Sequence, residues 1–278
     1  MTLVVRQDLL IYQIKLTMFS PSKTISKDDI QELYYITDID NVASILDKGI
    51  LSHNNAQNIP HKDISSKKIQ ALRQGKVISS GVPNEPKSPL WSFVCLFAQP
   101  HNAMMYVSRE KHICVLRIDK NILSEENVLI SDRNASCRYA KFTQAKNWTL
   151  TDKTAQCLYS RYSLPCSTTA IDTNDYKSIR QLEILCPKTI AKHYILGFFT
   201  KQKEDMQELL NILKEKLISL PISINANIFF LGKSLKLKTF TPIVTNTLDD
   251  STQEQVNTSE NANADEAPII DAFGTFTI

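Results

Sequence analysis

The chain has 278 residues, 42% hydrophobic and 22% charged, which are values of a soluble globular protein with one large domain or two ordinary ones. All 32 lysine and arginine residues lie within residues 1–240 with 22 of the 29 acidic ones, so this part carries a net charge of +10 and suits a polyanionic partner. Charged and polar residues interrupt the hydrophobic patches of residues 1–17, which excludes a secretory signal and a membrane span there.

Composition also predicts the domain limits. Residues 1–25 form an N-terminal extension, and Met18 is an equally good start of the protein. Residues 26–241 form the folded domain. Residues 242–278 are polar, acidic and without a basic side chain, which predicts a disordered tail.

Six cysteines are dispersed along the chain, and no two of them form a C-x-x-C pair. Several lie in apolar, strand-like segments, which favours reduced, buried thiols and an intracellular (cytoplasmic) protein over a disulfide framework. The five histidines do not complete a zinc site with them, because no pair has ligand spacing on a recognisable helix. We therefore predict no metal.

The first predicted element is a strand at residues 33–37, Leu-Tyr-Tyr-Ile-Thr, rich in aromatic and β-branched residues. A helix follows, capped by Asp38 or Asp40, and Gly49 provides its C-terminal stop. A second helix is expected from about Ser66 to Gln74, before Gly75.

Residues 77–89 contain three prolines and read as a long loop, which inside a domain is often functional. Residues 143–178 also read as a loop or insertion. The other predicted elements, in chain order, are a strand at 91–98, a short helix at 102–107, strands at 112–118, 128–130, 181–186 and 193–199, an amphipathic helix at 203–217 and a strand at 222–231. Strands and helices alternate irregularly, which favours an α+β domain on a mixed sheet.

Glu183 stands out within the strand predicted at 181–186. Side chains alternate along a strand, so Gln181, Glu183 and Leu185 share one face while Leu182 and Ile184 share the other. A lone glutamate on a strand is usually a solvated residue. The apolar face can pack on a core, however, which leaves Glu183 facing whatever lies opposite.

Five short patterns occur in a fixed order along the chain. They are Leu33-Tyr34-Tyr35-Ile36-Thr37 with Asn41 and Gly49; His61-x-x-Ile64 with Ile69-Gln70-x-x-Arg73; Phe97 with Pro100-x-Asn102-Ala103-Met104-Met105-Tyr106; Ser131-Asp132-x-Asn134-Ala135; and Arg180-Gln181-Leu182-Glu183. Together, over residues 32–200, they resemble the DarT family of NAD-dependent ADP-ribosyltransferases, toxins that modify bases of single-stranded DNA. The resemblance implies an ADP-ribosyltransferase-like split mixed β-sheet flanked by helices, with NAD as co-substrate between its halves.

By this resemblance Glu183 is the catalytic carboxylate. Cleavage of the nicotinamide–ribose bond develops positive charge on the ribose, which a facing carboxylate stabilises. The same group can remove the proton from the attacking base. Arg73 matches an arginine near the NAD phosphates and the reacting base, a role that a permanently charged guanidinium fits. An exposed arginine at a helix end is the alternative for Arg73.

The resemblance also implies NAD-binding roles for four residues, Tyr35, Thr37, Asn41 and Tyr106. Thr37 and Asn41 sit where the strand turns into the first helix, and the helix N-terminus is an alternative role for Asn41. Tyr106 is equally suited to filling the core. Tyr35 departs from the family, which has a histidine there that helps to hold the adenosine ribose; the tyrosine hydroxyl can also donate and accept hydrogen bonds.

Three residues are expected at the DNA, namely His61, Asn134 and Arg180. A loop histidine is often incidental, and the chemistry of residues 131–134 alone also suits a turn. The run before Pro100, Val94-Cys95-Leu96-Phe97, lacks the proline that the family has in this segment.

The leading hypothesis is transfer of ADP-ribose from NAD to thymine or guanine in single-stranded DNA, with no membrane partner. The resemblance implies an antitoxin, a macrodomain-type ADP-ribosylglycohydrolase that removes the modification. A protein acceptor is the alternative, and a non-catalytic nucleic-acid-binding relative is the third reading. The acidic tail, with its charge of −7, is a candidate DNA mimic for the basic domain.

Overall fold

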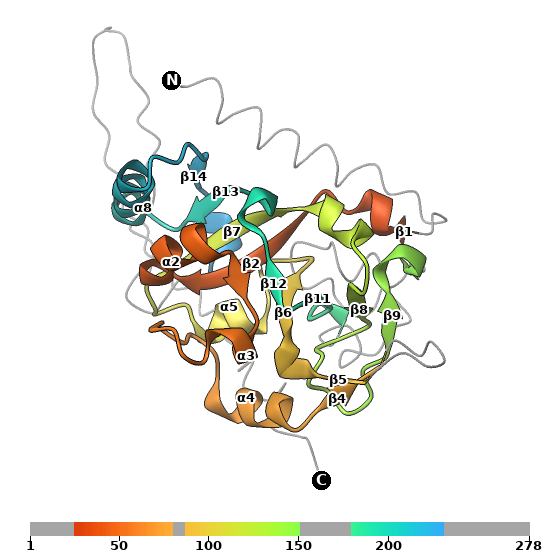
Figure 1. Cartoon of the computed structure of the whole chain (residues 1–278). Helices are drawn as coiled ribbons and strands as arrows, with labels where there is room; N and C mark the ends of the chain where they lie inside the picture. The colour runs from red at the N-terminus through yellow and green to blue at the C-terminus, as the bar shows by residue number, and fades with distance from the viewer. Residues whose placement is uncertain (1–24, 80–86, 151–178, 231–278) are drawn as a thin grey trace, which may run out of the picture. The chain divides into compact units, whose positions relative to one another are not determined.

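The computed structural model describes residues 25–79, 87–150 and 179–230 (Figure 1). The predicted N-terminal extension before Ile25, the acidic tail and residues 151–178 lie outside the described residues. Within the described residues the central sheet has eight strands in the order β14-β13-β7-β2-β6-β11-β8-β9. They are β2 (Glu32–Asp38), β6 (Phe93–Phe97), β7 (Ile113–Asp119), β8 (Leu129–Ser131), β9 (Phe142–Gln144), β11 (Glu183–Pro187), β13 (Ile195–Thr200) and β14 (Ile222–Ile224).

In the same part of the chain, three two-stranded ribbons and several short helices surround this sheet. The ribbons pair β1 (Ile25–Ser26) with β10 (Thr149–Leu150), β3 (Ile50–Leu51) with β12 (Thr189–Ile190), and β4 (Val77–Ile78) with β5 (Ser88–Pro89). The α-helices are α2 (Val42–Lys48), α3 (His53–Ala56), α4 (Lys67–Gln74), α5 (Ala103–Val107) and α8 (Lys203–Glu215). The 3-10 turns are η1 (Lys27–Asp29), η2 (Ile39–Asn41), η3 (Leu90–Ser92), η4 (Lys120–Ser124), η5 (Ala145–Asn147), η6 (Lys192–Tyr194) and η7 (Ala226–Ile228). None of the helices in the described ranges is long and apolar enough to cross a membrane.

The sheet is mixed, as the sequence predicts, because β13 and β14 are parallel whereas the other neighbouring strands are antiparallel. It is also split. In the described residues β2 pairs with β7 over seven positions and β11 pairs with β6 over five, but β2 and β6 pair only at Tyr34 and Phe97. The two central strands therefore diverge after a single pair, which opens the sheet between its halves.

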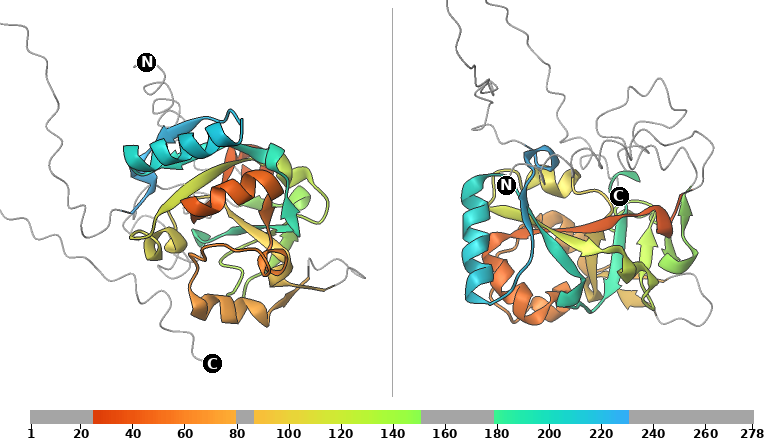
Figure 2. Two further views of the ribbon diagram at one scale, coloured as in Figure 1. Left: turned by 60° about the vertical axis from the view of Figure 1, so that its left-hand side comes forward. Right: turned by 90° about the horizontal axis from the view of Figure 1, so that it is seen from above.

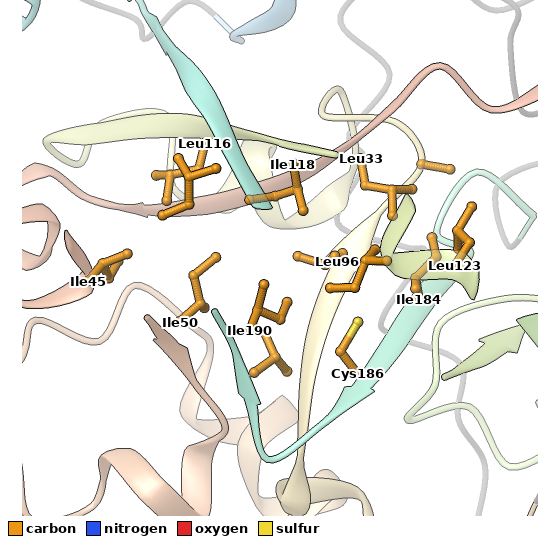
Figure 3. Close-up of a cluster of buried hydrophobic side chains, with 14 of the residues drawn as sticks. Leu33, Ile45, Ile50, Leu96, Leu116, Ile118, Leu123, Ile184, Cys186 and Ile190 are labelled. Carbon is orange, nitrogen blue, oxygen red and sulfur yellow. The ribbon is translucent and has the colours of Figure 1, made fainter. Parts of the chain in front are cut away.

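One face of the sheet carries the largest hydrophobic cluster (Figure 3). Leu33, Leu96, Leu116 and Ile184 bring this cluster together from four neighbouring strands. Helices α2 and α8 lie side by side against it (Figure 2). Alternation along β11 sends Glu183 to the opposite face. The fold thus packs helices against this face and leaves the opposite face for the site.

The first helix begins as predicted from its caps. The Asp38 carboxylate accepts a hydrogen bond from the backbone N–H of Asp40 at 3.1 Å and caps η2, after which α2 runs to Gly49. The helices predicted at 66–74, 102–107 and 203–217 are also confirmed.

Three predicted elements differ from the structure. Strand β11 begins at Glu183 rather than at residue 181, so Gln181 is not part of it. The last strand ends at Ile224, and residues 226–228 form η7, which brings Ile228 and Phe229 onto a second buried cluster with Tyr34 and Phe97. The segments predicted as loops contain short strands at 77–78, 88–89, 142–144 and 149–150. Short ribbons lack the periodicity that a sequence pattern requires.

Gly49 provides a test of this local geometry. Its φ is 80°, and a Cβ added there would lie 2.4 Å from the carbonyl oxygen of Ile190. We expect Gly49→Ala to lower the free energy of unfolding by about 1–3 kcal/mol, as measured in urea. Gly75→Ala is the matched control, because Gly75 has a φ of −84° and its added Cβ meets no atom within 4 Å. Equal stability of the two variants would contradict this account.

Candidate active site

A buried ion pair lies where the sheet splits. Arg73 donates from Nη1 to Oε1 of Glu183 at 3.2 Å and from Nη2 to Oε2 at 3.0 Å. The exposed fraction is 9% for Arg73 and 1% for Glu183. This parallel, two-fold contact is the strongest geometry that a guanidinium and a carboxylate can adopt, and it fixes both groups in one orientation.

Two distant parts of the chain supply this pair. Glu183 is the first residue of β11 and is paired in register with Phe97 of β6. Arg73 is in the last turn of α4, where a cation interacts favourably with the helix dipole. Helix α4 is held near the sheet by Trp91, whose Nε1 donates to Oε1 of Gln70 at 3.1 Å. The sequence prediction that pairs Arg73 with Glu183 at one site is therefore consistent with the geometry.

The simpler readings of both residues are wrong. Glu183 is not a solvated strand residue, and Arg73 is not an exposed helix end. Burial lowers the pKa of the Arg73 guanidinium, but its neighbours Cys95 and Glu183 raise that pKa by more, so the net shift is upward. Arg73 therefore remains a cation, which is what keeps a carboxylate tolerable in this buried position.

Cys95 is a further member of the site, and it was not predicted. Arg73 Nη2 donates to Cys95 Sγ. Cys95 lies on β6 and is paired with Leu185 of β11, the strand that begins at Glu183. Burial, opposed by Arg73, raises the pKa of the Cys95 thiol to about 12. The thiol is thus neutral at physiological pH. The alternation of β6, which puts residues 93, 95 and 97 on the Glu183 face, is the signal that could have found it.

Ser131, the last residue of β8, fixes the backbone of Glu183. Its Oγ accepts a hydrogen bond from the N–H of Glu183 at 3.0 Å and donates toward the carbonyl oxygens of Glu183 at 3.1 Å and of Arg133 at 2.5 Å. Ser131 is fully buried. The ladder between β8 and β11 ends at Ile130 and Ile184, so this hydroxyl continues it by one residue.

Replacing Ser131 with alanine is expected to reduce transferase turnover about tenfold, because a buried N–H beside the carboxylate loses its acceptor and Glu183 loses its fixed position. The measurement is kcat with NAD and oligonucleotide, together with unfolding in urea. Ser108→Ala is the matched control, since Ser108 is also fully buried and donates to the carbonyl of Ile64 at 3.2 Å. If both variants lose the same stability and neither loses turnover, Ser131 does not position Glu183.

The residues expected to hold NAD are arranged in two groups. Asn41 Nδ2 donates to Thr37 Oγ1 at 3.1 Å and to the carbonyl oxygen of Lys62 at 2.9 Å, and Asn41 Oδ1 accepts from the N–H of Lys62 at 2.8 Å. The amide therefore joins the strand end to the 59–66 loop. Tyr35 is half-buried against the main cluster, and burial, followed by electrostatic interaction with Cys95 and Asp63, raises its pKa to about 12.

Tyr106 belongs to a different group. Its ring meets the Phe230 ring edge-on, and the Arg109 guanidinium lies over it. The side chain is half-buried, and its role in NAD binding stays a prediction.

The three residues expected at DNA occupy different positions. His61 is exposed, and its Nδ1 lies 2.7 Å from the carbonyl oxygen of Ile59. Asn134 Nδ2 donates to Gln181 Oε1 at 3.4 Å, so the turn after β8 lies beside the segment that precedes Glu183. Arg180 Nη2 donates to the carbonyl oxygen of His101 at 3.4 Å. The structure thus brings Asn134 and Arg180, but not His61, next to the start of β11.

Asp38, Asp40 and His112 form one group that could hold a metal ion, because their ligand atoms lie within 4.8 Å of one another. Sequence reasoning missed it, since residues 40 and 112 meet only through the pairing of β2 with β7. Asp40 is paired with Lys62, which lowers the pKa of this carboxyl, and His112 Nε2 lies 3.1 Å from Glu208. The protein therefore already supplies partners for these charges.

Comparison with known proteins identifies the family. Residues 34–230 match the family described as ssDNA thymidine ADP-ribosyltransferase, DarT. A DNA ADP-ribosyl transferase–DNA ADP-ribosyl glycohydrolase fusion protein of Thermosipho africanus is 35% identical over an alignment of 113 residues, and the match covers 38% of this chain and 28% of that protein. The chain thus spans well under half of that relative's length.

Solved structures agree with this result. Thermosipho africanus DarTG in complex with ADP-ribose is 25% identical with a TM-score of 0.61, covering 72% of this chain and 51% of that one. Thermus sp. 2.9 DarT in complex with ADP-ribosylated ssDNA has the same fold, with 20% identity and a TM-score of 0.60, covering 75% of this chain and 100% of that one. The same Thermus protein in complex with NAD+ is 18% identical with a TM-score of 0.53, covering 73% of this chain and 98% of that one. The family match covers most of the chain and the neighbours share its fold, so the chain belongs to the DarT family of ssDNA thymidine ADP-ribosyltransferases.

Proposed function

We propose that this protein transfers ADP-ribose from NAD to a base of single-stranded DNA, with thymine the base that the family description favours. The observation that carries the proposal is the buried, doubly hydrogen-bonded pair of Arg73 and Glu183 at the split of the sheet. NAD+ and ADP-ribosylated ssDNA in the related Thermus structures support the same pair of substrates here.

The chemistry follows from the position of the carboxylate. The bond between nicotinamide and the ribose C1′ breaks, nicotinamide leaves with the bonding electrons, and a ring nitrogen of the base forms the new bond to C1′. Glu183 stabilises the cationic ribose and accepts the proton of the base. Each carboxylate oxygen has a second lone pair, so Glu183 can bind a ribose hydroxyl while Arg73 still holds it.

The remaining residues have supporting roles in this proposal. Tyr35, Thr37 and Asn41 line the entry to the first helix and contact NAD, with the Tyr35 hydroxyl in place of the family's histidine. Asn134 and Arg180 adjoin the start of β11 and contact DNA. The basic charge of residues 1–240 attracts the polyanion. Arg73 and Glu183 need no metal for these roles.

A DNA-modifying enzyme of this kind acts inside the cell and requires a neutralising partner. The Thermosipho relative joins the transferase to an ADP-ribosyl glycohydrolase in one chain. We therefore infer a toxin–antitoxin pair in which a macrodomain-type glycohydrolase removes the ADP-ribose.

The test is incubation of the protein with NAD and single-stranded oligonucleotides of varied sequence, followed by mass spectrometry. A gain of one ADP-ribose unit on a thymine-containing strand is expected. Labelled NAD in a lysate, treated separately with nuclease and protease, separates DNA from a protein acceptor. Label that survives nuclease but not protease would show that the acceptor is a protein rather than DNA. NAD binding without transfer to DNA or protein would show that the protein is a non-catalytic relative.

A further inference from the structure

Four side chains next to the active site form a stack of rings that the proposed chemistry does not use. The ring centroids of His101 and Phe230 are 3.7 Å apart at 32°, and Tyr106 meets Phe230 edge-on at 5.2 Å and 90°. The guanidinium of Arg109 lies 4.1 Å from the centroid of the Tyr106 ring. We call His101, Tyr106, Arg109 and Phe230 the aromatic platform.

The platform lies at the edge of the second hydrophobic cluster, against which Phe230 packs. All four of its side chains are half-buried. Their neighbours Met105 and Phe229 are buried at 0% and 4% exposure and fill the second cluster together with Tyr34 and Phe97. Met105 and Phe229 are thus buried in the cluster, whereas Tyr106 and Phe230 lie at its edge and are partly accessible. Three partly accessible rings beside a reactive site suit a ligand with flat faces.

The platform begins at the catalytic strand. Arg180 donates to the carbonyl oxygen of His101, and Arg180 precedes Glu183 by three residues, a separation of at most about 10 Å. On the neighbouring strand, Phe97 pairs with Glu183, and His101 follows four residues later. A chain that presents one unit to Glu183 can therefore extend its next units over these rings.

The charge around the platform suits a polyanion. Arg109 belongs to the platform, and two more cations adjoin it: Arg180 Nη2 donates to the carbonyl oxygen of His101 at 3.4 Å and Lys201 Nζ donates to that of Arg109 at 3.3 Å. Glu110, 3.9 Å from Arg109, is the acidic neighbour. The His101 ring itself is neutral, because burial and then Arg180 lower its pKa to about 4. It is therefore an uncharged ring with cations nearby.

We propose that the aromatic platform binds the bases that flank the modified base in single-stranded DNA, by stacking on Phe230, Tyr106 and His101 with Arg109 beside the backbone. This inference rests on the proposed function, and it makes the platform a determinant of DNA affinity. The adenine of NAD is the other flat ligand available, and the experiment separates the two.

Phe230→Leu keeps an apolar side chain but removes the ring. We expect it to raise the Kd for a twelve-nucleotide strand, measured by fluorescence anisotropy, about tenfold, and to raise the KM for DNA to the same extent, with the KM for NAD unchanged. Phe230→Tyr should restore both values. The control is Tyr194→Leu. The Tyr194 ring forms a similar pair with His193, with centroids 4.3 Å apart, but it packs against the main cluster instead of the platform.

Abasic sites in the DNA sharpen the test. One strand lacks the base on the 5′ side of the target and another lacks the base on the 3′ side. The strand that lacks the base stacked on Phe230 should bind the native protein about tenfold more weakly but bind Phe230→Leu as the intact strand does, because the two changes remove the same contact. Additive effects, an unchanged Kd, or a raised KM for NAD alone would overturn the inference. If the native protein binds DNA through Phe230 but transfers nothing to it, the proposed function fails while the platform stands as a DNA-binding surface.

Discussion

Glu183→Gln is expected to reduce ADP-ribosyl transfer about 10³-fold while NAD still binds. Glutamine has the same shape and can still accept from Arg73, but it carries no charge to oppose the cationic ribose and cannot take a proton from the base. Electrostatic stabilisers and general bases each contribute factors of 10² to 10⁴, which sets the size of the effect. The measurement is single-turnover transfer to an oligonucleotide, with NAD binding followed by calorimetry.

The variant must be separated from one that merely misfolds. Replacing the anion leaves the Arg73 cation buried without its charge partner, so some stability is also lost. Assays at 15–20 °C below the melting temperature of the variant, with NAD affinity within about threefold of native, isolate the catalytic effect. Transfer within tenfold of the native rate under these conditions would show that Glu183 is not the catalytic carboxylate.

The sequence specified the helices and the main strands well, because each has a local signal. Gly49 and Gly75 end their helices where expected, and Asn102 caps α5 by accepting from the N–H of Met105 at 3.0 Å. The mixed, split sheet and the family assignment are also confirmed. These features depend on residues close together in the chain or on a motif order that one sequence displays.

Contacts between distant segments are what the sequence could not provide. Ser131 and Glu183 are 52 residues apart, and Cys95 reaches Arg73 only because β6 pairs with β11. The aromatic platform needs Phe230, which the hydrophobic pattern places in a strand, to return to α5 through η7. The motif predicts NAD binding for Tyr106, but it does not predict the contact of its ring with Arg109. Register and chain reversal, rather than composition, decide such contacts.

Arg73→Met is expected to lower the free energy of unfolding by about 3–5 kcal/mol and to abolish transfer. The buried carboxylate of Glu183 would lose both of its charge-assisted hydrogen bonds, and Cys95 would lose its cationic neighbour. The exposed fractions of 9% and 1% leave little access for water to replace them. Unfolding in urea with fluorescence detection measures the loss.

A double-mutant cycle shows whether the pair is kept for stability or for chemistry. Glu183→Leu alone should lower the free energy of unfolding by a similar amount, because it leaves the guanidinium unpaired. The double variant, Arg73→Met with Glu183→Leu, should be close to native in stability, since two apolar side chains can replace a buried ion pair at little cost. All three variants should be inactive. A stable but inactive double variant would mean that the fold does not require this ion pair and that the reaction does. A double variant as unstable as the sum of the two single ones would show instead that Arg73 and Glu183 act independently, and the proposed site would lose its central contact.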